Sequence, residues 1–195
     1  MSDWTKETIK NHAKGLARIS LIHMLAVALG WAAYPLILLI LARYMTVDLP
    51  VAIYSVVASL VYAAMLISQG NEYGIMDSKP YNWARYKAKG FVLGAAVGVI
   101  VFLAELILIA IAERHFVIAH PNFDIANINS YIRMLLYIPF FWFYKLVWAG
   151  EEIIPRVTVL SALFPVGFIS LFTGIGYLFG TAGVVVDFRP KKRKK

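Results

Sequence analysis

Long apolar runs separated by clusters of basic residues constrain this chain more than any other feature. Three runs reach the length of a membrane-spanning helix, and a fourth is longer than one span needs. Because lipid cannot satisfy backbone N–H and C=O groups, and the runs lack the alternating polarity of barrel strands, we expect α-helices. The sequence therefore predicts an all-α integral membrane protein, a single polytopic domain over residues 1–195. The expected spans are residues 19–42, 51–68, 91–112 and 157–186.

The composition agrees with a lipid environment. The chain is 61% hydrophobic and 15% charged, with a mean hydropathy of +0.70, whereas soluble proteins are nearer half apolar and a quarter charged. The absence of Cys excludes disulfides, thiolate metal sites and a Cys nucleophile. The first run is too long for a signal peptide and has no small-residue cleavage site close behind it, so we interpret it as a retained helix.

The distribution of basic residues predicts the orientation. Lys and Arg favour the cytoplasmic side of short loops, and three clusters hold fourteen of the 19 Lys and Arg residues. An even number of spans places all fourteen, and both termini, in the cytoplasm. We therefore expect a plasma-membrane protein with this orientation. The clusters are Lys6, Lys10, Lys14 and Arg18, then Lys79, Arg85, Lys87 and Lys89, and finally Arg189, Lys191, Lys192, Arg193, Lys194 and Lys195.

The stretch 131–150 decides the number of spans. Its apolar part, residues 134–149, forms only about 24 Å of helix, against a hydrocarbon core of roughly 30 Å, and it contains Pro139 and Lys145. We expect an interfacial or re-entrant segment on the outer face, in addition to a bundle of four transmembrane helices. The alternative is six short spans, in which residues 134–149 cross the membrane and the last run breaks near residues 173–176.

Glycines on two predicted helices indicate close helix packing. Gly90, Gly94 and Gly98 repeat the small-xxx-small spacing that lets two backbones approach in lipid, and Gly176 and Gly180 repeat it in the last run. We expect helix-packing contacts at all five positions. Packing within the chain's own bundle is the preferred interpretation, and a second copy or another membrane protein is the alternative.

Glu105 is the one acid inside a clear span, on nearly the same helical face as the glycines. A charged carboxylate in hydrocarbon is costly, so this side chain should face the bundle interior and be either neutral or paired. It is a possible intramembrane proton or ion site, or else a neutral acid that binds a neighbouring helix. His23 is interpreted as a packed or interfacial residue, because no second ionisable group lies one turn away.

The basic segments also predict contacts with the membrane surface. Residues 1–18 are expected to form a cytoplasmic amphipathic segment, and residues 187–195 a basic cytoplasmic tail that serves as a topogenic anchor rather than as a nucleic-acid contact. The loop 69–90 contains both aromatic and basic residues, a composition that suits anionic lipid headgroups. The residues expected to contact headgroups are Trp83, Arg85, Lys87 and Lys89.

No catalytic motif appears in the chain. Phosphate-binding glycine loops, His-Glu zinc helices and nucleophile elbows are absent, and the spacing of Glu113, His115, His120 and Asp124 matches no named metal site. We therefore expect no enzymatic activity, no metal and no cofactor.

The predicted function is that of a non-catalytic multi-pass membrane protein. It would be a subunit or accessory of a larger membrane assembly, with a membrane-protein partner or a second copy docked on its glycine faces, in contact with anionic lipids and not with nucleic acid. The alternative is a small-solute or ion transporter, or a substrate-binding membrane component, that uses Glu105. In size and in its six-span variant the chain looks like the substrate-binding components of energy-coupling-factor vitamin transporters, a resemblance that involves no motif.

Overall fold

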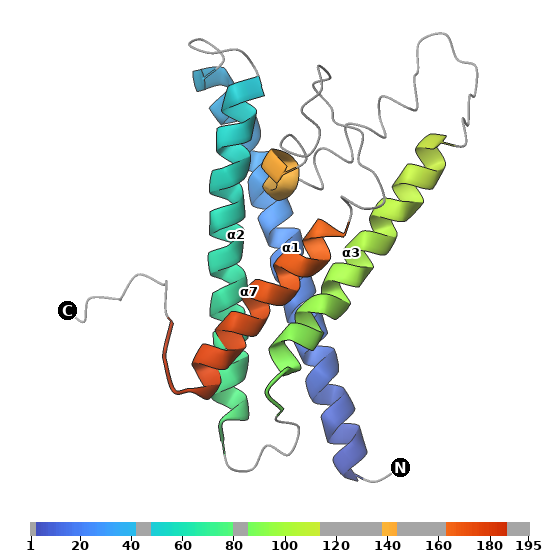
Figure 1. Ribbon diagram of the computed structural model, residues 1–195, viewed down its shortest axis with the longest axis vertical. Coiled ribbons are helices and arrows are strands. Elements are labelled where there is room, and N and C mark those ends of the chain that lie inside the picture. Colours follow the sequence, from blue (N-terminus) through green and yellow to red (C-terminus); the bar gives the residue numbers. More distant parts are fainter. Residues whose placement is uncertain (1–2, 42–47, 80–85, 114–137, 144–162, 187–195) are drawn as a thin grey trace, which may run out of the picture. The chain divides into compact units, whose positions relative to one another are not determined.

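The computed structural model describes residues 3–41, 48–79, 86–113, 138–143 and 163–186, and no strand occurs among them (Figure 1). Each of its four long helices contains a segment long and apolar enough to cross a membrane. Within the described ranges, the predicted all-α architecture with four candidate spans is therefore confirmed. The elements are α1 (Asp3–Leu41), α2 (Asp48–Asp77), α3 (Lys89–Glu113), the short 3₁₀ helix η1 (Ile138–Phe140) and α7 (Phe164–Thr181).

The long helices differ from the predicted spans mainly at their polar ends. Residues 1–18 and 19–42 were expected as two segments, but α1 is one helix of 39 residues, about 58 Å long. Likewise, α2 continues nine residues beyond the expected end at residue 68, to Asp77. Hydropathy marks the part of a helix that can enter lipid, whereas backbone hydrogen bonds continue through the polar residues on either side.

The last helix is shorter than its apolar run. It begins at Phe164 and runs without interruption through residues 173–176, so the break required by the six-span alternative is not present. Gly183 ends it with a φ of 79°, while the amides of Gly183 and Val184 donate to the carbonyls of Gly180 and Phe179 at 3.1 and 2.9 Å. This pair of bonds is a Schellman motif, which needs the left-handed conformation that glycine adopts readily.

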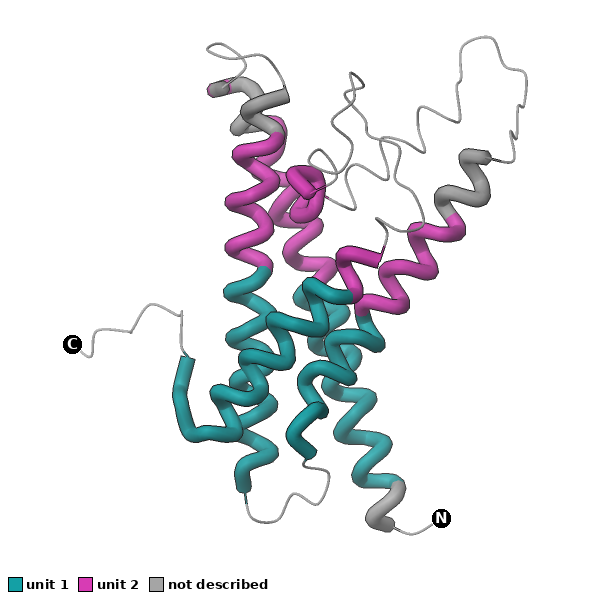
Figure 2. Tube along the Cα trace, in the orientation of Figure 1, with its two compact units in different colours: residues 1–22, 63–97, 167–195 teal, residues 23–62, 98–166 magenta. Residues whose placement is uncertain are grey.

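The chain divides into two compact units, and every long helix contributes a segment to each of them (Figure 2). Unit 1 contains residues 1–22, 63–97 and 167–195, and unit 2 contains residues 23–62 and 98–166. Each unit has its own interior, and different polar side chains are buried in the two interiors.

In unit 1, α7 packs closely against both α2 and α3. A β-carbon added to Gly94 of α3 would lie 2.7 Å from the backbone oxygen of Ile169, and one added to Gly74 of α2 would lie 2.7 Å from the amide nitrogen of Thr181. Such distances leave no room for a side chain. Backbone-to-backbone contact through glycine therefore holds α7 in place, as expected for helices that associate by packing.

In unit 2, aromatic residues form the interior around η1. The ring of Phe140 makes edge contacts with Tyr62 and Phe164, at centroid distances of 6.0 and 5.7 Å, and Phe143 stacks on Phe164 at 3.8 Å. The hydroxyl of Tyr54 donates a 2.6 Å hydrogen bond to the carbonyl of Gly30. Large aromatic surfaces in edge-to-face contact contribute packing energy beyond the area that they bury.

Candidate functional site

A buried ion pair joins three helices of unit 1. The Nζ atom of Lys89 lies 2.6 Å from Oδ2 of Asp77, and the hydroxyl of Tyr177 donates to the same oxygen at 3.0 Å. Lys89 and Tyr177 are 0% exposed and Asp77 is 1% exposed. Because a buried charge is tolerated only when it is paired and hydrogen-bonded, this cluster depends on all three side chains being in place.

Each of the two charges lies at the end of its helix where the helix dipole is unfavourable for a charge of that sign. Asp77 is the last residue of α2, where the dipole favours cations, and Lys89 is the first residue of α3, where it favours anions. The dipole therefore does not explain these residues, whereas the ion pair does. Lys89 thus differs from its predicted role as a headgroup contact, because its ammonium group is enclosed between α2, α3 and α7.

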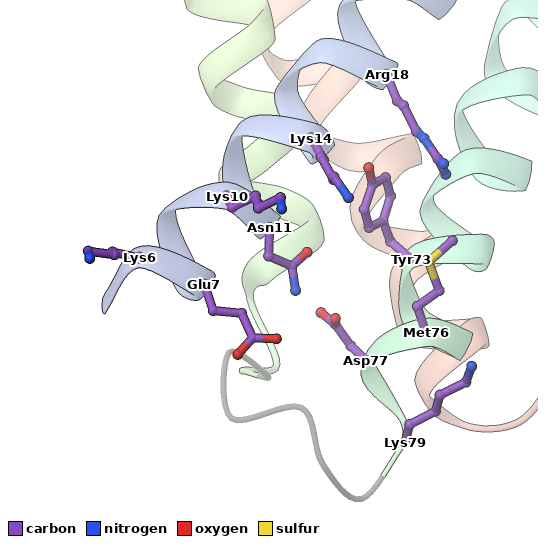
Figure 3. A pocket seen from close by; sticks show the side chains of 10 residues that line it. All are labelled: Lys6, Glu7, Lys10, Asn11, Lys14, Arg18, Tyr73, Met76, Asp77 and Lys79. Carbon is purple, nitrogen blue, oxygen red and sulfur yellow. The ribbon is translucent and has the colours of Figure 1, made fainter. Parts of the chain in front are cut away.

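Beside this cluster, unit 1 contains a cavity of about 670 Å³ (Figure 3). Its described lining consists of ten residues, which belong to α1, to the end of α2 and to the turn that follows α2. Five of the lining side chains are basic and two are acidic. The basic ones on α1 recur at every fourth residue, which places them along one side of the helix. The lining charges are Lys6, Lys10, Lys14, Arg18 and Lys79, opposed by Glu7 and Asp77.

Tyr73 lies on the α2 side of this cavity and is 4% exposed. The guanidinium carbon of Arg18 is 6.0 Å from the centroid of its ring, a distance typical of a cation–π contact. Its buried hydroxyl has no hydrogen-bond partner among the residues that the structure describes. No sequence signal marked Tyr73, since a lone tyrosine in an apolar helix is usually a packing residue.

Just before α3, Tyr86 stacks on His12 of α1 with a centroid distance of 6.1 Å. Partial burial raises the pKa of the Tyr86 phenol, and the charge of Asp77 raises it further. The phenol is therefore neutral at physiological pH. This contact packs the residues just before α3 against α1.

The polar residues predicted within the spans lie in unit 2. Glu105 is 0% exposed, on the inward face of α3, the face expected from its spacing to the glycines. His23 is buried, and its Nδ1 atom lies 2.8 Å from the hydroxyl of Tyr62, a contact that the sequence analysis did not anticipate. This geometry agrees with the interpretation of His23 as a packed residue.

Two serines of α2 bind the backbone of the short segment around η1. Ser55 donates to the carbonyl of Ile138 at 2.6 Å, and Ser59 donates to the carbonyl of Pro139. In return, the backbone amide and the indole N–H of Trp142 donate to Ser55 and Ser59, at 2.9 and 2.6 Å. Residues 138–143 are thereby held against a candidate span, and the rest of the predicted segment 131–150 lies outside the described residues.

The five glycines predicted as packing positions all contact helices of this chain. Gly90 and Gly94 lie against α7 within unit 1, and Gly98 lies against Val166 of α7 within unit 2. Gly176 and Gly180 lie against Ile67 and Asn71 of α2. The other glycines in close backbone contact, Gly70 and Gly74, were not predicted, because the expected second span ended before them.

The remaining predicted sites have different outcomes. Lys87 is exposed, as a headgroup contact requires, while Trp83, Arg85 and the basic tail lie outside the described residues. Among the residues that the structure describes, no three His, Cys, Asp or Glu side chains come close enough together to hold a metal ion. Comparison with protein-family models, with curated proteins and with solved structures found no match.

Proposed function

We propose that this chain is a non-catalytic, four-span integral membrane protein that serves as an accessory subunit of a larger membrane assembly. The observation that carries the proposal is how the buried polar groups are used. Several buried polar side chains form hydrogen bonds with other groups of the same chain. Examples are the Asp77–Lys89–Tyr177 cluster, the His23–Tyr62 pair and the bonds of Ser55 to residues 138 and 142. Such bonds stabilise and orient helices.

The proposed subunit role requires a surface for a partner, and the glycine faces are already filled by the chain's own helices. Large apolar side chains remain exposed on all four long helices, where lipid or another membrane protein would cover them. We therefore place partner contacts on these outer faces, rather than on the glycine faces proposed from the sequence. Examples are Leu21 on α1, Leu60 on α2, Ile100 on α3 and Leu171 on α7.

This role is tested by the size of the assembly in native membranes. We expect the chain, extracted in mild detergent at native expression level, to migrate well above its own mass of 21.9 kDa. A photo-crosslinking residue at one or more of Leu21, Leu60, Ile100 and Leu171 should join it to another protein. The same residue at Leu66, which is buried in α2, is the control and should not. A chain that migrates alone and crosslinks to no protein would contradict the proposal.

The orientation proposed from the charge distribution has structural support. All seven Lys and Arg residues that the structure describes lie in unit 1, and none of them lies in unit 2. Because basic residues favour the cytoplasmic side, the basic residues of unit 1 are proposed to lie at the cytoplasmic side of the membrane. In unit 2, serines of a candidate span bond the carbonyls of Ile138 and Pro139 and the amide of Trp142. These bonds favour a re-entrant segment, since irregular backbone at membrane depth must be buried in protein.

The proposed topology is checked by labelling single cysteines in this Cys-free chain. We expect Ser2→Cys, Ser78→Cys and Lys195→Cys to resist a membrane-impermeant thiol reagent in intact cells, and to react after permeabilisation. Asn127→Cys, in the proposed outer loop, is the control and should react in both conditions. Labelling of Lys195→Cys alone among the first three would indicate five spans and refute the even number.

A second candidate function, transport of a small solute or ion, is favoured by one observation. Glu105 is completely buried in a candidate span, and intramembrane ionisable groups are enriched at transport sites. A transporter would be complete as a single chain or a homo-oligomer. The crosslinking experiment therefore separates the two candidates, because only the accessory subunit requires a different protein at its exposed faces.

A further inference from the structure

We infer that the basic cavity of unit 1 is a binding site for a phosphate group, carried either by an anionic lipid headgroup or by a soluble phosphorylated molecule. Its volume of about 670 Å³ lies within the usual range for ligand pockets, roughly 300–1,000 Å³. The site does not depend on the accessory role proposed above. It rests on three features of the cavity: its excess of positive charge, the spacing of its basic residues and one unsatisfied hydroxyl.

Most of the cations that line the cavity have no ion pair within the described part of the chain. Among the described residues, Lys10, Lys14, Arg18 and Lys79 form no ion pair. Of the two acids in the lining, the carboxylate of Asp77 already accepts from Lys89 and Tyr177. A multiply charged anion such as a phosphate ester would offset this excess, and it suits several donors better than a single carboxylate does.

The spacing of the basic residues on α1 is itself unfavourable without a ligand. Lys6, Lys10, Lys14 and Arg18 follow one another at intervals of four, and like charges at this spacing repel one another and weaken a helix. A solvated surface would not require these residues to face a cavity. An anion that binds between these four basic side chains would be attracted by all of them. Their spacing therefore suits an anion-binding site better than a solvated surface.

The hydroxyl of Tyr73 gives the cavity a hydrogen-bond donor in a fixed position. It is buried, it lines the cavity and it lacks a partner among the described residues, whereas a buried hydroxyl without a hydrogen bond is costly. In the close-up, Lys14 and Arg18 extend from α1 toward Tyr73, while Glu7 and Asp77 lie at the other end of the cavity (Figure 3). A phosphate oxygen at the Tyr73 end would accept a hydrogen bond from this hydroxyl and lie close to the two cationic side chains. The charges of Asp77 and Glu72 also reach this hydroxyl, so the cations must outweigh them.

The test uses two probes with the full chain. Glycerol 3-phosphate is titrated into the protein in phosphatidylcholine nanodiscs, and phosphatidic acid is offered to the detergent-solubilised protein, with retention measured by native mass spectrometry and thermal stabilisation. We expect saturable binding of one or both. A response to phosphatidic acid alone assigns the phosphate to a lipid, and a response to glycerol 3-phosphate alone assigns it to a soluble molecule.

Two variants with matched controls decide whether the cavity is the site. Lys14→Gln and Tyr73→Phe should each weaken binding by about tenfold, through loss of a charge-assisted contact. Lys87→Gln, measured with glycerol 3-phosphate because Lys87 is itself a predicted contact for lipid headgroups, and Tyr86→Phe make the same chemical changes outside the cavity. Each should alter binding by less than about twofold. Lys14 is exposed and the Tyr73 hydroxyl is unsatisfied, so neither change should disturb folding.

Three results would overturn the inference. The first is the absence of saturable binding of either probe by the unmodified chain. The second is equal weakening by Lys14→Gln and Lys87→Gln, which would indicate diffuse attraction to surface charge. The third is unchanged binding by Tyr73→Phe, which would remove the phenol from the site.

Discussion

Replacing Lys89 with methionine is expected to lower the free energy of unfolding by about 3–5 kcal/mol. The change removes one partner of a fully buried ion pair and leaves the carboxylate of Asp77 enclosed with Tyr177 as its remaining assigned donor. The effect is measured by SDS titration of the protein in mixed micelles. Lys87→Met is the control, because Lys87 is an exposed lysine two positions earlier in the chain and should change stability by less than about 0.5 kcal/mol.

Removing the whole cluster should cost much less than removing Lys89 alone. The combined variant Asp77→Leu, Lys89→Met, Tyr177→Phe removes the carboxylate, the ammonium group and the phenol of the cluster together, and apolar replacement of a buried ion pair is often neutral or stabilising. Most of the stability lost in Lys89→Met should therefore return. If the combined variant is less stable than Lys89→Met, the three residues do not act as the coupled unit that their geometry indicates.

The four long helices could be predicted from the sequence because burial in lipid requires a continuous apolar run about twenty residues long. The ends of the helices could not be predicted in this way. The first eighteen residues and the last turns of α2 are polar, and hydropathy cannot distinguish a polar helix from a polar loop. Only Gly183, as a C-terminal cap, was a readable signal for the end of α7.

The polar sites were less predictable than the helices. Glu105 stands out in its run, and its inward position follows from its seven-residue spacing to Gly98. Asp77 and Lys89 do not stand out, because they lie twelve residues apart in a segment that reads as a solvated loop. Their pairing depends on how the ends of α2 and α3 meet α7. Each charge opposes the dipole at the end of its helix, but this mismatch can be seen only once the helix ends are known.

The cavity shows the same limit of sequence analysis. The basic residues of α1 were predicted to face the cytoplasm, and their spacing was visible in the sequence. That they face Tyr73 follows from α1 continuing as a helix beside the end of α2, which no local pattern encodes. The basic residues of α1, which were expected only to set the orientation in the membrane, therefore form a candidate binding site because α1 lies beside the end of α2.

Gly176→Ala is expected to destabilise the protein, and Gly167→Ala, on the same helix, is expected not to. A β-carbon on Gly176 would lie 2.8 Å from the carbonyl carbon of Ile67 and closer still to its oxygen, whereas one on Gly167 would have no atom within 4 Å. Overpacking of this kind costs about 1–3 kcal/mol. At Gly167, alanine should be neutral or should stabilise α7 by up to about 1 kcal/mol, through its higher helix propensity.

The effect at Gly176 should also reach the ion pair, because the next residue is Tyr177. Any movement of α7 away from α2 lengthens the 3.0 Å hydrogen bond from Tyr177 to Asp77. The losses from Gly176→Ala and Tyr177→Phe should therefore be less than additive in the double variant, by about 0.5 kcal/mol or more. SDS titration of the parent, the two single variants and the double variant measures this coupling. Full additivity, or equal stability of Gly176→Ala and Gly167→Ala, would show that α7 is not held in place by backbone contact at Gly176.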